Sequence, residues 1–169
     1  MKKLLLILLV AFSSCTNVQK EASEEITTYY LIRHAEKDRS DPTNEDPELN
    51  AEGMERANKW AEVFDAVKFD AIYSTPYKRT MQTAMPTANS KKLKNLGYDP
   101  NKLFDQDFEA GTKGKTILVV GHSNTTPMFV NAILGDSVYE NIDDSQNGAL
   151  FIVEILPDGK KTHKVLYIN

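Results

Sequence analysis

Two apolar runs in this 169-residue chain each end at a histidine. The first is Leu31-Ile32-Arg33-His34, and the second is Val119-Val120-Gly121-His122. Runs of Ile, Leu and Val are typical of buried strands in α/β proteins, and the residues just past their carboxyl ends line the ligand crevice. We therefore expect Arg33, His34 and His122 to meet in a cationic, titratable pocket that is suited to phosphate.

The pair Arg33-His34 has the chemistry to bind and attack a phosphoryl group. A guanidinium offers phosphate oxygens a planar fork of donors. A neutral imidazole nitrogen can attack phosphorus to form a phosphohistidine, and the ordinary pKa of histidine keeps that nucleophile populated near neutrality. An Arg-His pair by itself is also compatible with a surface ion pair, so the interpretation depends on what else reaches the same edge.

Arg79 and His122 are expected at that edge. Arg79 falls in the first turn of a helix that follows a strand, where the helix dipole disfavours a cation unless an anion is bound nearby. His122 precedes another helix, whose free backbone N–H groups can bind an anionic group. A solvated arginine and a hydrogen-bonded structural histidine are the alternatives. With His34 on a neighbouring strand, we interpret both residues as phosphate ligands.

The chain around these residues alternates between strand and helix patterns, which predicts an α/β fold. Strands are expected over Ile26–Arg33, Phe69–Ser74, Asn95–Tyr98, Thr116–Gly121, Ala149–Leu156 and Lys164–Ile168. Helices are expected from Asn50 to about Ala66, from Thr75, from Asp99 to about Ala110, and from Thr126 to Gly135. The expected architecture is a three-layer α/β/α sandwich with a mainly parallel central sheet over residues 26–169.

Capping residues predict the helix ends. Asn50 is expected to be an N-cap, and Thr75-Pro76 and Thr126-Pro127 each match an N-cap followed by proline at the first helical position. Gly135 suits a helix C-terminus, and Pro86 predicts a kink or an early end of its helix. Pro157-Asp158-Gly159 predicts a hairpin turn.

The N-terminal residues predict export. Lys2 and Lys3 precede an unbroken apolar run, Leu4–Phe12, which is too short to span a bilayer and is typical of a signal peptide over residues 1–14. Phe12-Ser13-Ser14-Cys15 resembles the lipobox of bacterial lipoproteins, although phenylalanine replaces the commoner leucine. Cys15 is then lipidated, residues 15–25 form a tether, and the protein is anchored to a bilayer of the cell envelope. An ordinary signal peptide is the alternative.

The charge of the chain limits the partners that it attracts. The formal net charge is −4, and removal of residues 1–14 takes away two lysines and no acid. A net acidic surface does not attract nucleic acid, and an anionic substrate must be captured by a local pocket. We therefore expect a small phosphorylated substrate or a phosphopeptide and no nucleic acid.

Several segments resemble the signatures of the histidine phosphatase superfamily, also called phosphoglycerate mutase-like. They are Arg33-His34-Ala35, Ser74-x-Pro76-x-x-Arg79-x-x-Gln82-Thr83-Ala84 and Gly121-His122-Ser123, with Leu49-Asn50-Ala51-Glu52-Gly53-x-x-x-Ala57 similar to the family's first-helix motif. They follow the family's order and span most of residues 26–130. The chain most resembles the short, phosphohistidine-phosphatase-like members.

The resemblance implies roles for these residues. His34 is the nucleophile, and Arg33, Arg79 and His122 form a phosphate cage, with Ser123 as a further phosphate ligand. No metal and no organic cofactor is implied. The family's usual glycine after the nucleophile is replaced by Ala35.

The proton donor is less clearly marked. In the family it is usually a carboxylate in an insert after the second arginine, and here that segment, Lys91–Lys113, is short. Asp105, Asp107 and Glu109 are candidates, with Asp105 preferred, and Glu36 is a rival. A solvated acidic face is the alternative for all four.

These features predict a metal-independent phosphohydrolase of the histidine acid phosphatase type, which acts on a phosphomonoester or a phosphoamidate. A mutase is disfavoured because the chain lacks a long insert to cover the substrate. A zinc site at His34, Glu36 and His122 is disfavoured because two arginines would repel the cation. The other alternative is a lipoprotein that binds phosphate or a phosphorylated ligand without turnover, and such a protein has no need for a nucleophile at His34.

Overall fold

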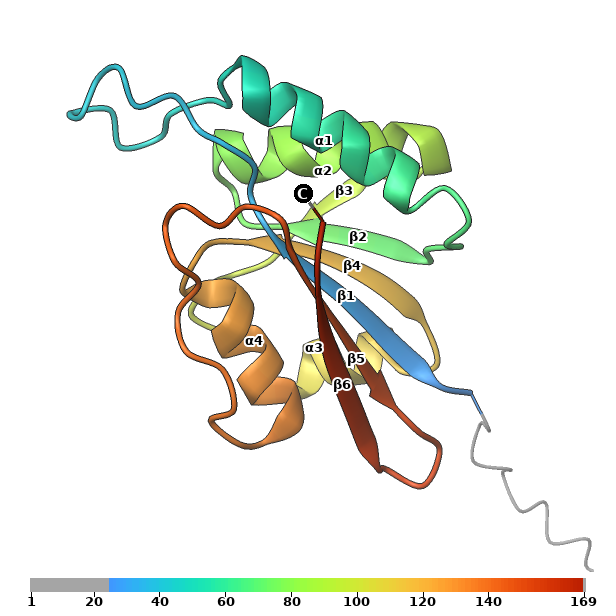
Figure 1. Cartoon of the computed structure of the whole chain (residues 1–169). Helices are drawn as coiled ribbons and strands as arrows, with labels where there is room; N and C mark the ends of the chain where they lie inside the picture. The colour runs from blue at the N-terminus through green and yellow to red at the C-terminus, as the bar shows by residue number, and fades with distance from the viewer. Residues whose placement is uncertain (1–24, 169) are drawn as a thin grey trace, which may run out of the picture.

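The computed structural model describes residues 25–168, which fold around a six-stranded sheet of order β3-β2-β4-β1-β5-β6 (Figure 1). The strands are β1 Thr27–Arg33, β2 Ala71–Ser74, β3 Asn95–Gly97, β4 Thr116–Gly121, β5 Ala149–Ile155 and β6 Lys161–Tyr167. The first four strands pair with one another in parallel, and β5 pairs antiparallel with both β1 and β6. The predicted mainly parallel sheet is confirmed.

Helices cover both faces of the sheet. They are α1 Ala51–Val63, α2 Lys78–Lys91, α3 Gln106–Thr112 and α4 Thr125–Leu134. Figure 1 shows α1 and α2 on one side and α3 and α4 on the other, which confirms the three-layer α/β/α arrangement. The strand ends that carry Arg33 and Gly121 are therefore held between two helical layers.

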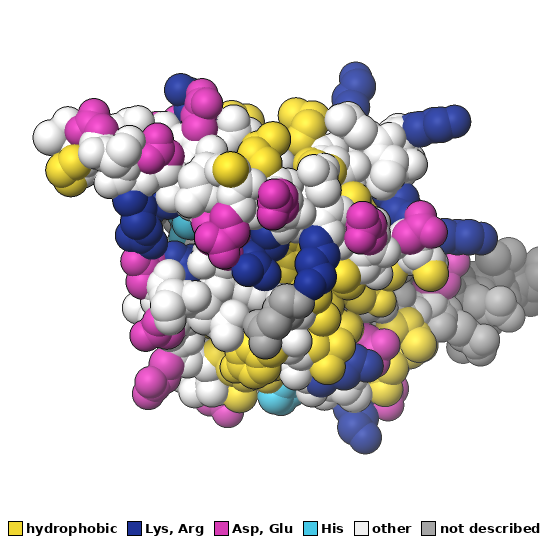
Figure 2. Space-filling view, turned by 45° about the horizontal axis from the view of Figure 1, so that its top comes forward, with side chains coloured by type: hydrophobic (Ala, Val, Ile, Leu, Met, Phe, Trp, Pro, Cys, Tyr) yellow, Lys and Arg dark blue, Asp and Glu magenta, His cyan; other side chains and the backbone are white. Residues whose placement is uncertain are grey.

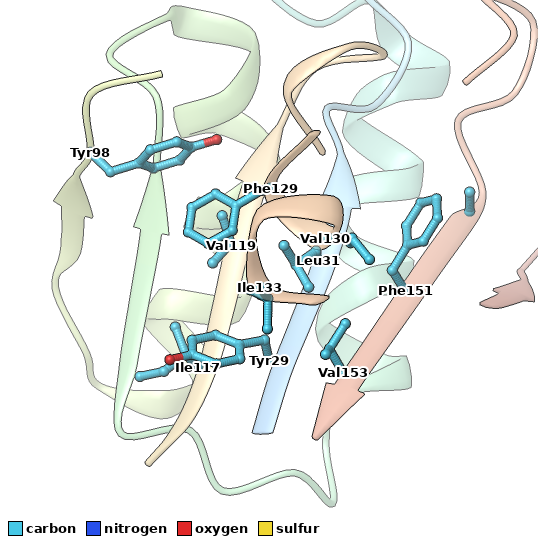
Figure 3. Packing of buried hydrophobic residues seen from close by; sticks show 11 residues of the cluster. Tyr29, Leu31, Tyr98, Ile117, Val119, Phe129, Val130, Ile133, Phe151 and Val153 are labelled. Carbon is cyan, nitrogen blue, oxygen red and sulfur yellow. The ribbon is translucent and has the colours of Figure 1, made fainter. Parts of the chain in front are cut away.

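Alternate residues of β1 supply two separate cores. Tyr29 and Leu31 point to the α4 side, where they join Phe129 and Ile133 (Figure 3). Ile32 points to the opposite side and packs in a cluster with Trp60. Successive side chains of a strand alternate between faces, and burial of each large apolar side chain stabilises the fold by about 1.5–3 kcal/mol. The two cores fix β1, and with it the position of its last residue.

Several predicted helix ends are confirmed. The Asn50 side chain accepts a hydrogen bond from the Gly53 N–H and caps α1. Gly135 ends α4 with φ of 75°, a left-handed conformation that suits glycine. The hairpin turn lies between β5 and β6, where the Leu156 N–H bonds to the Lys160 carbonyl.

Two predicted threonine caps are wrong. Helix α2 begins at Lys78 with Tyr77 as its N-cap, and α4 begins at Thr125 with Asn124 as its N-cap. The threonine hydroxyls serve other partners: that of Thr75 bonds to the Thr80 hydroxyl, and that of Thr126 donates to the Ile32 carbonyl of β1.

Pro86 was expected to kink α2 or to end it early; of these two alternatives the early end is wrong, because the helix continues to Lys91. Its buried face is rich in threonine and alanine, and packing of Thr83, Ala84, Thr87 and Ala88 against the sheet side holds the helix past the proline. Met54 of α1 and Met81 of α2 lie at the surface.

The helix expected from Asp99 starts later. Residues 99–104 form turns, and α3 begins at Gln106 with Asp105 as its N-cap. The preference of Asp-Pro for a turn is satisfied before the helix begins.

Residues 1–14, Cys15 and most of the expected tether lie outside the described residues. Within residues 25–168, no helix has both the length and the apolar character needed to cross a membrane.

Candidate active site

His34 directly follows β1 and is almost completely buried. Its backbone N–H donates to the Gly121 carbonyl of β4 over 2.8 Å. Its ring Nδ1 lies 2.7 Å from the Ala35 carbonyl oxygen. A carbonyl can only accept, so Nδ1 carries the proton and the lone pair of the neutral ring is on Nε2. The backbone therefore selects the tautomer in which Nε2 is the nucleophile.

The surroundings keep His34 and His122 neutral. Burial, and then the charges of Arg33, His122 and Arg79, lower the pKa of His34 to about 3, against the opposing hydrogen bond to Ala35. Burial, and then Arg79 and Arg33, lower the pKa of His122 to about 4. At neutral pH the imidazole of His34 is therefore a free base.

His122 lies beside His34, with the two ring centroids 5.5 Å apart. The His122 backbone N–H donates to the Thr125 hydroxyl at the start of α4. Gly121 makes this fit possible, because a Cβ there would lie 2.8 Å from the Thr126 hydroxyl and 2.9 Å from that of Thr125. Glycine at this position therefore allows β4 and α4 to approach each other closely.

Arg33 is the most enclosed member of the cage. Its Nη1 donates to the carbonyl oxygens of Asp143, Asp144 and Gln146 over 3.0–3.2 Å, and its Nη2 donates to the Asp144 carboxylate. Its Nε is buried and has no hydrogen-bond partner within residues 25–168.

Arg79 lies in the first turn of α2, as expected. Its guanidinium carbon is 4.5 Å from the centre of the Tyr77 ring, and that ring in turn lies 5.1 Å from the His122 ring. The Arg79 Nη1 is 3.6 Å from a carboxylate oxygen of Asp46, which makes an ion pair without a hydrogen bond. The Tyr77 ring thus restrains a guanidinium whose Nε and Nη1 are buried and have no hydrogen-bond partner among residues 25–168.

The structure brings together four of the residues expected to do chemistry: Arg33, His34, Arg79 and His122. The His122 Nε2 is also buried without a hydrogen-bond partner among the described residues. Buried donors that the protein itself does not satisfy are costly, and they are common where a ligand completes the hydrogen bonding. Four such nitrogen atoms lie on Arg33, Arg79 and His122, the three residues that act electrostatically on His34.

An open pocket of about 350 Å³ adjoins the cage. Its lining includes Tyr77, Arg79 and His122, together with Asn101, Asn124 and Met128. Figure 2 shows basic side chains beside a partly visible histidine at one edge of the molecule. The pocket offers neutral polar and apolar contacts to whatever group is attached to the phosphoryl.

Three of the four candidate proton donors are engaged elsewhere. Both Glu36 carboxylate oxygens accept from the Arg56 Nε, over 2.7 and 2.9 Å. The Asp105 carboxylate accepts from the Phe108 N–H and caps α3. Glu109 lines a different pocket together with Thr27, at the opposite end of β1 from His34.

Ser123 lies beside His122 in the loop before α4, and its carbonyl accepts from the Ile142 N–H. Within the described part of the chain, no group of three or more His, Cys, Asp and Glu side chains is arranged to hold a metal ion.

Sequence reasoning missed the loop before β5. Asp144 binds Arg33, and the Asn147 side-chain amide donates to the His34 carbonyl over 2.9 Å. The only signal for this loop in the sequence was its position in the chain, because a strand that pairs antiparallel with β1 must begin beside the end of β1 that precedes His34. Tyr77 and Asp46 were missed as well, because their roles depend on contacts between segments.

Comparison with known proteins agrees with this geometry. Residues 29–101 match the histidine phosphatase superfamily (branch 1). The chain is 35% identical over 74 residues to phosphoserine phosphatase 1 of Hydrogenobacter thermophilus, a match that covers 41% of this chain and 35% of that relative. The chain thus spans about a third of the curated relative's length.

Solved structures share the fold over nearly their whole length. One is the protein histidine phosphatase SixA complexed with tungstate, with a TM-score of 0.66 and 15% identity, covering 83% of this chain and 96% of that one. Another is the α-ribazole phosphatase of Shigella flexneri, with a TM-score of 0.65 and 16% identity, at the same coverage of 83% and 96%. At such identities the likeness shows the fold alone.

Proposed function

We propose that this chain, whose residues 29–101 match the histidine phosphatase superfamily, is a member of that superfamily and a metal-independent phosphohydrolase that acts through a phosphohistidine on His34. The observation that supports this most directly is the ring of His34. It is neutral, its proton is held on Nδ1 by the Ala35 carbonyl, and it lies beside the His122 ring and within the electrostatic influence of two arginines that carry unbonded donors among the described residues.

In the first step, the lone pair of Nε2 attacks phosphorus in line with the leaving group. A nitrogen–phosphorus bond forms, and the bond from phosphorus to the leaving oxygen or nitrogen breaks, with its electron pair going to the leaving group. Arg33, Arg79 and His122 donate to the other phosphoryl oxygens and stabilise the charge that they carry in the transition state. The proton on Nδ1 stays in place, so the ring becomes a phosphorylated imidazolium.

In the second step, water attacks phosphorus and the nitrogen–phosphorus bond breaks. The electron pair returns to Nε2, inorganic phosphate is released, and neutral His34 is regenerated. The proton lost by water balances the one taken up by the leaving group. The net reaction consumes one water molecule.

The proposed substrate class follows from the contacts that the candidate proton donors make. Glu36 is paired with Arg56, and Asp105 caps α3. A leaving group that needs little protonation suits such a site, which favours a phosphoamidate such as phosphohistidine, or an ester of a weakly basic alcohol. The open pocket beside the cage suits a small molecule or an exposed side chain of a phosphopeptide.

Two variants test the function. The purified chain is assayed with a chromogenic aryl phosphate in the presence of a chelator, and labelled phosphate is trapped on the protein. We expect His34→Asn to lower turnover at least about 10³-fold and to abolish the label. His163→Asn changes the remaining histidine, on β6, and retains both. Full turnover by His34→Asn would refute the proposal, and phosphate binding without turnover of several phosphoesters would favour a binding protein.

We also propose that the mature protein is a lipoprotein anchored through Cys15 and exported by residues 1–14. The support is the order of basic residues, apolar run and cysteine. Expression of the full chain in bacteria, with fractionation, tests this: the wild type is expected with the membranes, and Cys15→Ser is expected in the soluble fraction. A wild-type protein found entirely in the soluble fraction would contradict the anchor.

A further inference from the structure

The loop of residues 141–147, between α4 and β5, contacts three parts of the cage. It supplies three carbonyl oxygens and one carboxylate to Arg33. It donates from Asn147 to the carbonyl of His34. It is tied to the residue after His122, because the Ile142 N–H donates to the Ser123 carbonyl over 2.8 Å.

Within this loop, Asp144 is the only side chain that bonds to Arg33. One of its carboxylate oxygens accepts from the Arg33 Nη2, and the other accepts from the Arg39 Nη2 over 2.6 Å. The Arg33 side chain is 2% exposed, whereas that of Asp144 is 65% exposed. A carboxylate at the surface thus reaches inward to a buried guanidinium.

These bonds determine which part of Arg33 is left for a ligand. Nη1 has three acceptors and Nη2 has one, so both terminal nitrogen atoms are directed at the loop. Of the three guanidinium nitrogen atoms, Nε has no hydrogen-bond partner among residues 25–168. A guanidinium is planar, and fixing its two terminal nitrogen atoms also fixes the direction of the Nε–H bond.

We propose that Asp144 is a positioning residue: by holding Nη2, it turns the Arg33 guanidinium so that Nε–H is presented to the phosphoryl group beside His34. The expected effect of Asp144 on catalysis rests on the proposed function. Its expected effect on phosphate binding can be measured without any turnover. Asp144 acts through Arg33 and does not touch the substrate.

Electrostatics alone predicts that removal of Asp144 changes phosphate affinity in the opposite direction. Asp144 is a negative charge near an anion site, so by Coulomb's law alone its removal should strengthen phosphate binding. Positioning predicts weaker binding, because the freed guanidinium loses its orientation. The two explanations are therefore separated by the direction of the change.

Asp46 provides a matched control within the chain. It also lies beside a cage arginine, but 3.6 Å from the Arg79 Nη1 and without a hydrogen bond. The Asp46 carboxylate accepts a hydrogen bond from the Lys78 N–H, which the asparagine Oδ1 can also accept, so Asp46→Asn removes the same charge without removing a hydrogen bond to Arg79. We expect this variant to bind phosphate at least as tightly as the wild type.

The experiment is a calorimetric titration with inorganic phosphate, combined with steady-state kinetics on an aryl phosphate. For Asp144→Ala we expect about a tenfold rise in the phosphate Kd, together with a higher KM and a lower kcat. Asp144→Asn keeps an acceptor and should show a smaller change in the same direction. Asp158→Asn, an exposed position in the β5–β6 turn, should leave all values unchanged.

A double-mutant cycle shows whether the effect passes through Arg33. In the background of Arg33→Ala, the change Asp144→Ala should not alter the phosphate Kd further. Equal or tighter phosphate binding by Asp144→Ala, or an undiminished effect without Arg33, would overturn the inference.

The phosphate titration separates this inference from the proposed function. If the wild type binds phosphate but turns over no ester, the proposed function fails, while the Kd of the Asp144 variants still decides the inference.

Discussion

Arg33 and Arg79 carry the same guanidinium, but the protein surrounds them differently. Arg33 is enclosed by the 141–147 loop, which satisfies both of its terminal nitrogen atoms. Arg79 rests on the ring of Tyr77 and has a single ion pair, with Asp46, while its Nε and Nη1 remain unbonded. One arginine is oriented by hydrogen bonds before any ligand arrives, and the other is restrained mainly by a ring contact.

The difference indicates a division of work within the cage. A donor fixed in advance costs no reorganisation when charge develops in the transition state. In the proposed reaction, a donor with two nitrogen atoms unbonded among the described residues is able to follow the phosphoryl group as it moves from the leaving group to His34. The environment of each arginine thus suits a different part of the reaction, although the two look equivalent in the sequence.

The largest expected effect comes from removal of either arginine. We expect Arg33→Ala and Arg79→Ala each to lower kcat/KM about 10²–10³-fold, as loss of a transition-state donor does elsewhere. Only Arg33→Ala should also destabilise the fold, by about 2 kcal/mol, because it leaves the carbonyls of the loop without their donor. Aryl phosphate kinetics and thermal unfolding measure the two effects.

Lys78→Ala is the control for this pair, since Lys78 is adjacent to Arg79 in sequence but is exposed. It should change kcat/KM less than about twofold. Equal losses of stability in Arg33→Ala and Arg79→Ala would contradict the contrast between the two arginines.

An intermediate effect is expected from pH. The folded-state pKa values of His34 and His122, about 3 and about 4, lie below the unfolded value of about 6.5. The unfolded chain therefore binds more protons in this window, and the free energy of unfolding falls as the pH is lowered from about 6.5 toward 4. Each histidine contributes up to about 1.4 kcal/mol per pH unit. Denaturant unfolding at several pH values measures the slope.

The pKa values of the two histidines also distinguish the arginines. After burial, Arg79 is the largest cause of the lowered pKa of His122, whereas Arg33 acts more strongly than Arg79 on His34. Arg79→Gln should therefore raise the pKa of His122 more than that of His34, as followed by NMR of the imidazole protons. A wild-type stability that is independent of pH between about 6.5 and 4.5 would refute the assignment of neutral, buried histidines.

The smallest effect is expected at Tyr77. Tyr77→Ala removes the ring beneath Arg79, and a cation–π contact at a partly exposed site is worth about 0.5–1 kcal/mol. We expect KM for an aryl phosphate to rise about threefold to fivefold, with little change in unfolding. Tyr77→Phe keeps the ring and should behave like the wild type. If Tyr77→Phe is as impaired as Tyr77→Ala, the hydroxyl and not the ring is important.

Much of the fold was predictable because its signals are local. The apolar runs at Leu31 and Val119 marked buried strands, and Asn50 and Gly135 marked helix ends through their own capping preferences. The errors arose where tertiary contacts compete with local preference. Thr126 uses its hydroxyl on β1 instead of capping α4, and α2 passes through Pro86 because its threonine and alanine face is buried.

In the candidate site, too, some features follow from local sequence and others from tertiary contacts. The sequence by itself determined which residue types stand at the carboxyl ends of β1 and β4, because strand patterns and helix starts are local properties. Only the tertiary structure decided the protonated nitrogen of His34, the orientation of Arg33 by Asp144 and the engagement of Glu36 and Asp105 elsewhere. Most of these depend on hydrogen bonds between segments far apart in the chain, and such contacts are set by the packing of the sheet and its loops.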